Sequence, residues 1–197
     1  MPTKERIEKV RKVLCFRQPD LRIVLEDITN THNASAVIRT CDAAGVLNLD
    51  IISSSEEPLL INRAVSTRAE RWIEFHYYRS IRECLRQLKE KGLKIAATDL
   101  AEKSLLYTAL DYTQPIAIVF GNESEGISKE ALELADYKIK VPMIGMVHSL
   151  NLSVSVGVIL YEALKQRWSK GYYKEPRLSL KEFDALLKKW LSKSDRK

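Results

Sequence analysis

The stretch PIAIVFG, residues 115–121, constrains the fold of this chain more than any other feature. It is apolar at every position from 116 to 120, with no polar alternation. A run that is apolar on both faces is typical of a buried strand in a parallel sheet. Such a sheet needs helices over both of its faces, so we expect amphipathic helices between the strands.

Short β-rich runs and helical patterns do alternate along the chain. We predict strands over 21–25, 49–52, 72–78, 93–98, 115–121 and 137–142. We predict helices over 33–45, 80–92, 128–135 and 178–191, with a charged helix in the first 14 residues. Gly45 and Gly92 suit helix ends, and Ser128 suits a helix start. The alternation indicates an α/β domain with a mostly parallel sheet.

Residues 150–158 are harder to interpret from their pattern. Apolar residues at even positions alternate with Asn151, Ser153, Ser155 and Gly157. This period of two predicts a half-buried strand. The following stretch, 159–168, is rich in good helix formers and favours a helix.

Composition narrows the class of protein. The chain has 197 residues, 45% of them hydrophobic and 29% charged, which suits one soluble domain. No apolar run is long enough to span a membrane, and the charged N-terminus does not resemble a signal peptide. The three cysteines and three histidines show neither a disulfide framework nor metal-ligand spacing. We therefore expect a cytoplasmic protein without a metal.

Positive charge gathers at the two ends of the chain. Residues 1–19 hold six Lys/Arg against two Glu, and residues 165–197 hold eleven Lys/Arg against four Asp/Glu. Lysine and arginine clusters bind phosphates and release counterions, so RNA is a plausible partner. Two solvated helices that only aid solubility would give the same pattern.

Three loops follow predicted strands, where ligands bind in open α/β sheets. They are Thr98-Asp99, FGNESEGIS (120–128) and VPMIGMVHSLN (141–151). A fourth stretch, NTHNASAVIRTCDAAGV (30–46), carries Asn33 and Arg39. Singly, each of these has an ordinary reading: plain turns, Asn33 as a helix N-cap, and Arg39 paired with Asp42 at i+3. No GxGxxG fingerprint, P-loop or GxSxG elbow is present.

Taken together and in this order, NxxAxxRTCDAAGV, IVFGNESEGIS and VPMIGMVHSLNLSVSVGVILYE resemble the three motifs of the TrmH-type (SpoU) RNA 2′-O-methyltransferases. The resemblance covers about residues 20–165 and places the chain in the knotted SPOUT superfamily. It implies an α/β fold with a C-terminal trefoil knot, in which 150–158 is a helix. It also divides the chain into a methyltransferase domain, 20–165, and basic helical extensions, 1–19 and 166–197.

The same resemblance implies S-adenosylmethionine as cofactor and an RNA ribose 2′-hydroxyl as substrate. The basic extensions favour tRNA, at guanosine 18 of the D-loop, because ribosomal RNA members usually carry an added N-terminal domain. It further implies a homodimer and no metal. Carried over by motif, the expected catalytic residues are Arg39, Asn33, Glu123, Ser149 and Asn151. The expected cofactor contacts are Thr98, Gly121, Val141, Ile144 and Leu150.

The roles within this set stay partly open. Arg39 stays charged, so either a phosphate that it holds accepts the 2′-hydroxyl proton or its surroundings depress its pKa; we prefer the phosphate. Asn33 orients Arg39 or the ribose, and Glu123 pairs with Arg39 or orders the cofactor loop. Phosphate contacts are expected from Arg6, Lys9, Arg11, Lys12, Lys165, Arg167, Lys170, Lys188 and Lys189, and stacking from Trp168, Tyr172 or Tyr173. A ribosomal RNA substrate and a non-catalytic RNA-binding protein are the alternatives.

Overall fold

A parallel sheet forms the centre of the computed structural model, which describes residues 2–54 and 60–193. In the described part the sheet has seven strands in the order β3-β2-β1-β6-β4-β7-β5, and every pair of neighbouring strands is parallel. The strands are β1 (Gln18–Glu26), β2 (Val46–Ile52), β3 (Glu74–Tyr78), β4 (Lys94–Thr98), β5 (Leu105–Leu106), β6 (Ile116–Phe120) and β7 (Tyr137–Lys140). The predicted α/β class is confirmed.

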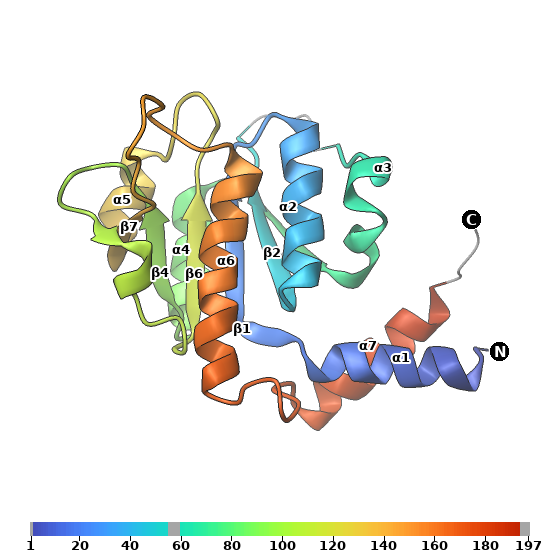
Figure 1. Cartoon of the computed structure of the whole chain (residues 1–197). Coiled ribbons are helices and arrows are strands. Elements are labelled where there is room, and N and C mark those ends of the chain that lie inside the picture. Colours follow the sequence, from blue (N-terminus) through green and yellow to red (C-terminus); the bar gives the residue numbers. More distant parts are fainter. Residues whose placement is uncertain (1, 55–59, 194–197) are drawn as a thin grey trace.

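Helices cover both faces of this sheet. They are α1 (Lys4–Cys15), α2 (Thr31–Ala43), α3 (Arg63–Ser66), α4 (Ile81–Glu90), α5 (Lys129–Leu134), α6 (Leu152–Ser169) and α7 (Leu180–Ser192), with 3-10 helices at Ala69–Trp72 and Tyr107–Ala109. Figure 1 shows α2, α3 and α6 on one face and α4 with α5 on the other, while α1 and α7 lie together below the sheet. The stretch that opened the sequence analysis is the central strand β6, buried at all five positions.

Outside 150–158, every predicted strand overlaps an observed one, although the bounds differ and one observed strand was not predicted. The third strand begins at Glu74 rather than at Trp72, because Trp72 ends a 3-10 helix. The two-residue strand β5 was not predicted, since Leu105 and Leu106 are too short a run to show a period. The predicted helix start at Ser128 and the predicted helix ends at Gly45 and Gly92 are confirmed. Ser128 is the N-cap of α5, and Gly45 and Gly92 have positive φ just beyond α2 and α4.

The strand predicted by alternation over 150–158 is wrong, and the helix implied by the resemblance is confirmed. Asn151 caps α6, whose buried residues Leu152, Val156, Ile159, Leu160 and Ala163 recur at helical spacing. The alternation is a coincidence of small residues. Ser153, Ser155 and Gly157 leave little bulk on α6, and α6 packs beside α2 over the sheet.

The two ends of the chain fold back onto the domain. Val10 and Leu14 of α1 pack with Leu178, Leu187 and Trp190 of the C-terminal segment in a separate hydrophobic cluster. The expected domain boundaries at 19/20 and 165/166 fall inside β1 and α6, so both extensions grow out of elements of the sheet layers. Nowhere in the described residues is a helix both long and apolar enough to cross a membrane.

Candidate active site

A cavity of about 520 Å³ lies beyond the carboxyl ends of β4, β6 and β7. Its volume is in the range of small-molecule sites, and its place in the fold is where open α/β sheets bind ligands. The loops that line it are the three that follow predicted strands. Eight of the ten expected site residues line this cavity: Asn33, Thr98, Gly121, Glu123, Val141, Ser149, Leu150 and Asn151.

Hydrogen bonds between side chains join the three sequence motifs at the cavity. Asn33 of α2, which is only 8% exposed, donates from Nδ2 to Oε1 of Glu123 at 3.1 Å. Asn151 donates from Nδ2 to Oδ1 of Asn33 at 3.0 Å. Asn33 thus holds a carboxylate on one side and an amide on the other, and residues 90 and 118 positions away in the chain meet at one point.

The reading of Asn33 as a helix N-cap is wrong, because Asn30 takes that place. The Asn30 side chain accepts from the backbone N–H groups of His32 at 2.9 Å and Asn33 at 3.0 Å. Asn33 therefore stands inside the first turn of α2, with its side chain free to bond Glu123. Asn151 serves twice, since its Oδ1 also accepts from the Ser153 N–H at 2.9 Å and caps α6.

Arg39 lies outside the cavity of its own chain. It is six residues beyond Asn33 on α2, which is about 9 Å along the helix and about a third of a turn around it. Its side chain is exposed and makes no hydrogen bond or ion pair with any described residue. A direct Arg39–Glu123 pair is absent from the described residues of one chain, where Glu123 accepts from Asn33 instead.

The ion pair between Arg39 and Asp42 is also wrong. Asp42 instead binds Arg17, whose Nη2 donates to Oδ1 and whose Nη1 donates to the Asp42 carbonyl at 3.2 Å. Arg17 is 1% exposed, so the Arg17–Asp42 ion pair is better shielded from water than a pair of Asp42 with the exposed Arg39 would be. The consequence is a guanidinium at Arg39 that is available to an anion such as an RNA phosphate.

The loop after β6 is shaped by close backbone packing. A Cβ added at Gly121 would lie 2.2 Å from the Gly126 carbonyl oxygen, so only glycine fits there. Asn122 fixes the loop from inside, because its Oδ1 accepts from the N–H groups of Ser124 at 2.8 Å and Glu125 at 3.0 Å. Asn122 was not among the expected site residues, although an asparagine at the start of a Gly-rich turn is a recognised signal for this Asx arrangement.

Two further contacts join this loop to the end of β1. Asn122 donates from Nδ2 to the carbonyl of Asp27 at 2.7 Å. Glu26, only 5% exposed, accepts from the Ser128 N–H at 3.0 Å. Asp27 has a φ of 50°, a conformation that a residue with a side chain adopts at some cost. The loop after β6, which belongs to the second family motif and is called the motif-two loop below, is therefore anchored to the end of β1. The chain enters α2 from the same strand end.

The walls of the cavity suit a ligand with a flat apolar part and polar edges. Apolar side chains of Phe120, Ile139, Leu150, Leu152 and Ile159 line it together with the loop backbone. The hydroxyl of Thr98 donates to the Val119 carbonyl at 3.0 Å, so a ligand would meet mainly the backbone of Thr98. No cluster of three or more His, Cys, Asp or Glu able to hold a metal occurs in residues 2–54 and 60–193.

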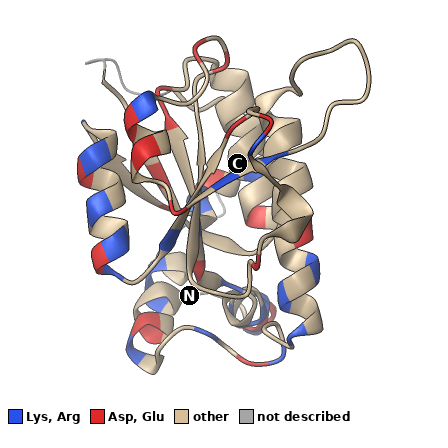
Figure 2. Ribbon diagram, turned by 90° about the vertical axis from the view of Figure 1, so that its left-hand side faces the viewer, with Lys and Arg blue, Asp and Glu red and all other residues tan. Residues whose placement is uncertain are grey.

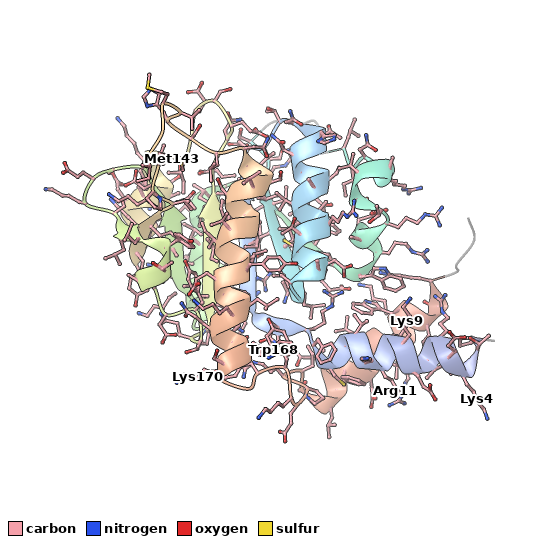
Figure 3. The ribbon with its side chains drawn as sticks, in the orientation of Figure 1. Lys4, Lys9, Arg11, Met143, Trp168 and Lys170 are labelled. Atoms are coloured by element: carbon pink, nitrogen blue, oxygen red, sulfur yellow. The ribbon has the colours of Figure 1, made fainter. Side chains whose placement is uncertain are left out.

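The loop between β7 and α6 reaches away from the body of the domain. Met143 lines the cavity, whereas the side chain of Ile144 is 94% exposed and does not line it. Figure 3 shows Met143 near the outer part of this loop. The expected contact from Ile144 stays a prediction, and it concerns the backbone of that residue.

The cysteines take no part in the site. Cys41 and Cys84 are fully buried, and burial raises the pKa of both thiols well above its ordinary value. A thiol that stays protonated is a poor nucleophile and a poor metal ligand.

Fold and site together define a family of RNA-modifying methylases. The model of the SpoU rRNA Methylase family matches residues 20–161, and the chain belongs to this family. A relative from Aquifex aeolicus (strain VF5), named tRNA (guanosine(18)-2′-O)-methyltransferase, is 41% identical over 186 residues, which are 94% of this chain and 88% of the relative.

Two solved structures extend the comparison. The chain is similar to the A. aeolicus TrmH/SpoU tRNA modifying enzyme, with a TM-score of 0.92, 40% identity and 98% of each chain covered. It is also similar to the SpoU methyltransferase AviRb from Streptomyces viridochromogenes in complex with AdoMet, with a TM-score of 0.67 and 25% identity over 77% of this chain and 60% of that one.

Proposed function

We propose that this protein transfers a methyl group from S-adenosylmethionine to the 2′-hydroxyl of guanosine 18 in tRNA. The observation that carries the proposal is the hydrogen-bonded chain Glu123–Asn33–Asn151, which joins all three family motifs at one cavity. A relative that matches nearly the whole chain, extensions included, carries this activity in its name.

The cavity beyond β4, β6 and β7 is the cofactor site. Its apolar walls fit the adenine, and the backbone groups of the loops fit the polar edges of the ligand. Gly121 leaves the space that a side chain would fill. When bound, S-adenosylmethionine supplies an electrophilic methyl group. Thr98, Gly121, Val141 and Leu150 hold it, with the backbone of Ile144 as an additional contact.

The ribose hydroxyl is a weak nucleophile, so the residues around it must position it and help its proton leave. Arg39 grips an RNA phosphate, which accepts that proton, and its exposed guanidinium, which has no partner among the described residues, supports this role. Asn33 orients the ribose and Glu123 keeps the motif-two loop in place. Ser149 and Asn151 stand at the cavity mouth beside the nucleotide.

A homodimer resolves the distance between Arg39 and the cavity of its own chain. The outer face of α6 carries apolar residues at helical spacing, Val154, Tyr161 and Trp168, which are 48%, 53% and 64% exposed. The helix α6 packs beside α2, the helix that carries Arg39 (Figure 1). A second copy packed on that outer face of α6 would bring Arg39 toward the partner subunit's cofactor. The trefoil knot and a cytoplasmic location belong to the same proposal.

The basic extensions grip the RNA backbone. Suitable exposed groups are Lys9, Arg11, Lys12, Lys165, Lys170, Lys188 and Lys189. Arg6 is partly buried and donates to the Lys193 carbonyl. Figure 2 shows positive charge on the helices below the sheet, and Figure 3 places Trp168 and Lys170 at the lower end of α6. Arg167 must be removed from this group, because its side chain is fully buried. Tyr172 is engaged inside the protein too, since the Arg177 guanidinium lies 3.9 Å from its ring centre.

The direct test is methyl transfer from labelled S-adenosylmethionine to an unmodified tRNA transcript, with the labelled nucleoside mapped. We expect label on the 2′-oxygen of guanosine 18, and none on a transcript with a 2′-deoxyguanosine at that position. Label on ribosomal RNA but not on tRNA would move the substrate. Cofactor binding without label on any RNA would favour a non-catalytic RNA-binding protein.

A further inference from the structure

A second cavity lies far from the cofactor site, where the two ends of the chain meet. It has a volume of about 580 Å³ and is lined by Thr3, Glu5, Arg6, Lys9, Val10, Val13, Asp42, Trp72 and Trp190. These residues come from α1, from the end of α2, from the 3-10 helix before β3 and from α7. Of these residues only Asp42 belongs to a family motif quoted above, and the proposed chemistry does not use the cavity.

Two indole rings form the aromatic wall of this cavity. Trp72 and Trp190 meet edge to face, with ring centres 5.3 Å apart. Cations stand over both rings: the Arg17 guanidinium is 5.2 Å from the ring centre of Trp190, and that of Arg71 is 5.4 Å from the ring centre of Trp72. The wall is therefore aromatic and electropositive at the same time.

Unpaired donors lie behind that wall. Trp190 is 1% exposed and its Nε1–H has no hydrogen-bond acceptor in the described part of the chain. The Nε–H of Arg17, beside the same ring, also lacks an acceptor there. Buried N–H groups nearly always have a partner, so these two donors mark a cluster that the described residues leave incompletely satisfied.

The rim adds two more cations on one face of α1. Arg6 and Lys9 are three residues apart, which places them side by side on the helix, and both line the cavity. Glu5 and Asp42 are the acidic groups of the lining, and Asp42 is neutralised by Arg17. Lys4 and Arg11 do not line the cavity, and Figure 3 shows them on the lower side of α1 while Lys9 is on the upper side.

We propose that this cavity, named here the extension cavity, binds one unpaired nucleotide, with the base against the half-buried indole of Trp72, which Trp190 supports from behind, and the phosphate at Lys9. Aromatic side chains take up bases that leave the stack, and lysine and arginine take their phosphates. The proposal rests on an RNA substrate, as argued above, and adds a second grip on the same molecule. Asp42 lies nine residues from Asn33 on α2, about 14 Å along the helix, so one folded RNA can reach both cavities.

Tryptophan fluorescence reads this cavity directly. The chain has three tryptophans, and Trp168→Phe leaves only the two that line the extension cavity. The W168F protein is titrated with guanosine monophosphate at low salt, in saturating S-adenosylhomocysteine so that the cofactor cavity is occupied. We expect saturable quenching, with inorganic phosphate alone giving much less.

Two lysines of α1 give a matched pair of variants in that background. Lys9→Ala removes a charge from the rim, and Lys4→Ala removes the same charge from the opposite side. We expect Lys9→Ala to weaken nucleotide binding about five- to tenfold and Lys4→Ala to change it by less than about twofold. Both lysines are exposed, so neither variant is expected to unfold.

The same pair of variants, in the natural Trp168 background, is then compared for the dissociation constant of a tRNA transcript. A larger loss for Lys9→Ala than for Lys4→Ala supports RNA as the source of the nucleotide. Quenching by the mononucleotide with equal tRNA affinities would mean a free nucleotide ligand and overturn the RNA part. Absence of saturable quenching, or equal losses for both lysines, would overturn the site. Failure of methyl transfer to tRNA would leave the quenching result standing, so the two proposals fail separately.

Discussion

Two arginines of the α2–α6 layer show how the same side chain serves different purposes. Arg39 is exposed and has no partner among the described residues. Arg167 is fully buried and donates to the Tyr112 carbonyl at 2.8 Å, to Gln18 at 3.0 Å and to Asp20 at 2.6 Å. A guanidinium whose donors are all used stabilises the fold, whereas one whose donors are unused is available to an RNA phosphate.

The largest effect in this comparison is expected from Arg167→Ala. It removes one partner of a buried ion pair and leaves the Gln18 side chain and two carbonyls without their donor. We expect a loss of about 3–5 kcal/mol in the free energy of unfolding, measured by urea denaturation.

Arg177→Ala is the matched control, because Arg177 binds the same carboxylate from a more exposed position. We expect a loss of about 1 kcal/mol or less for this variant. Equal losses for the two variants would mean that the buried guanidinium of Arg167 adds no more stability than the more exposed one of Arg177.

Arg39→Ala should show the opposite pattern. We expect kcat to fall about 10²–10³-fold, as for loss of a charged group in the transition state, with no change in the urea midpoint. Arg39→Lys keeps the charge but not the planar fork, and we expect it to recover only a small part of the activity. Near-full activity in the lysine variant would overturn the bidentate phosphate contact.

The sequence predicted the sheet well because its strands carry their own signal. A central strand such as β6 is apolar at every position, and an amphipathic helix such as α4 shows its buried face in its own spacing. The signals for the helix ends at Gly45 and Gly92 were equally local, since a positive φ favours glycine whatever the surroundings.

What the sequence could not predict depends on partners far along the chain. Asp42 pairs with Arg17, which is 25 positions away in the chain, and not with Arg39. Local spacing such as i, i+3 cannot predict a partner that is so distant in the sequence. The prediction of a strand over 150–158 was wrong for the same reason. Period-two spacing is a local pattern, whereas the burial of one side of α6 comes from α2 and the sheet. Motif resemblance supplied eight residues of the cavity. It also implied that Arg39 acts at a dimer interface, on a cofactor held mainly by one subunit, and that arrangement stays a prediction.

Asn151 allows the two kinds of role to be separated at a single position. Its Oδ1 caps α6 and its Nδ2 donates to Asn33. Asn151→Asp keeps the capping oxygen and loses the donor, whereas Asn151→Ala loses both. We expect about 1 kcal/mol of lost stability for the alanine variant and little for the aspartate variant. Methyl transfer should fall about tenfold in both, because the bond to Asn33 is lost in both. If activity instead followed stability, Asn151 would act only as a cap.

The smallest expected effect is an acid dependence of stability at Asp20. Burial acts to raise the pKa of this carboxyl, but the guanidinium groups of Arg167 and Arg177 outweigh it and hold the pKa below its ordinary value. A carboxyl with a lowered pKa in the folded state contributes stability above its unfolded value, near pH 4, and loses it as the pH falls through the folded value.

Urea midpoints at about pH 5.5, 4 and 2.5 measure this window. We expect Asp20→Asn to lower stability at the highest pH and to converge on the natural protein at the lowest, where Asp20 is protonated in both states. Asp184→Asn, at an exposed position on α7, controls for loss of a negative charge and should give parallel curves. Parallel curves for Asp20→Asn as well would mean that the charge of this carboxylate, although close to two arginines, adds no stability. The buried Arg167 would then be held by its neutral acceptors alone.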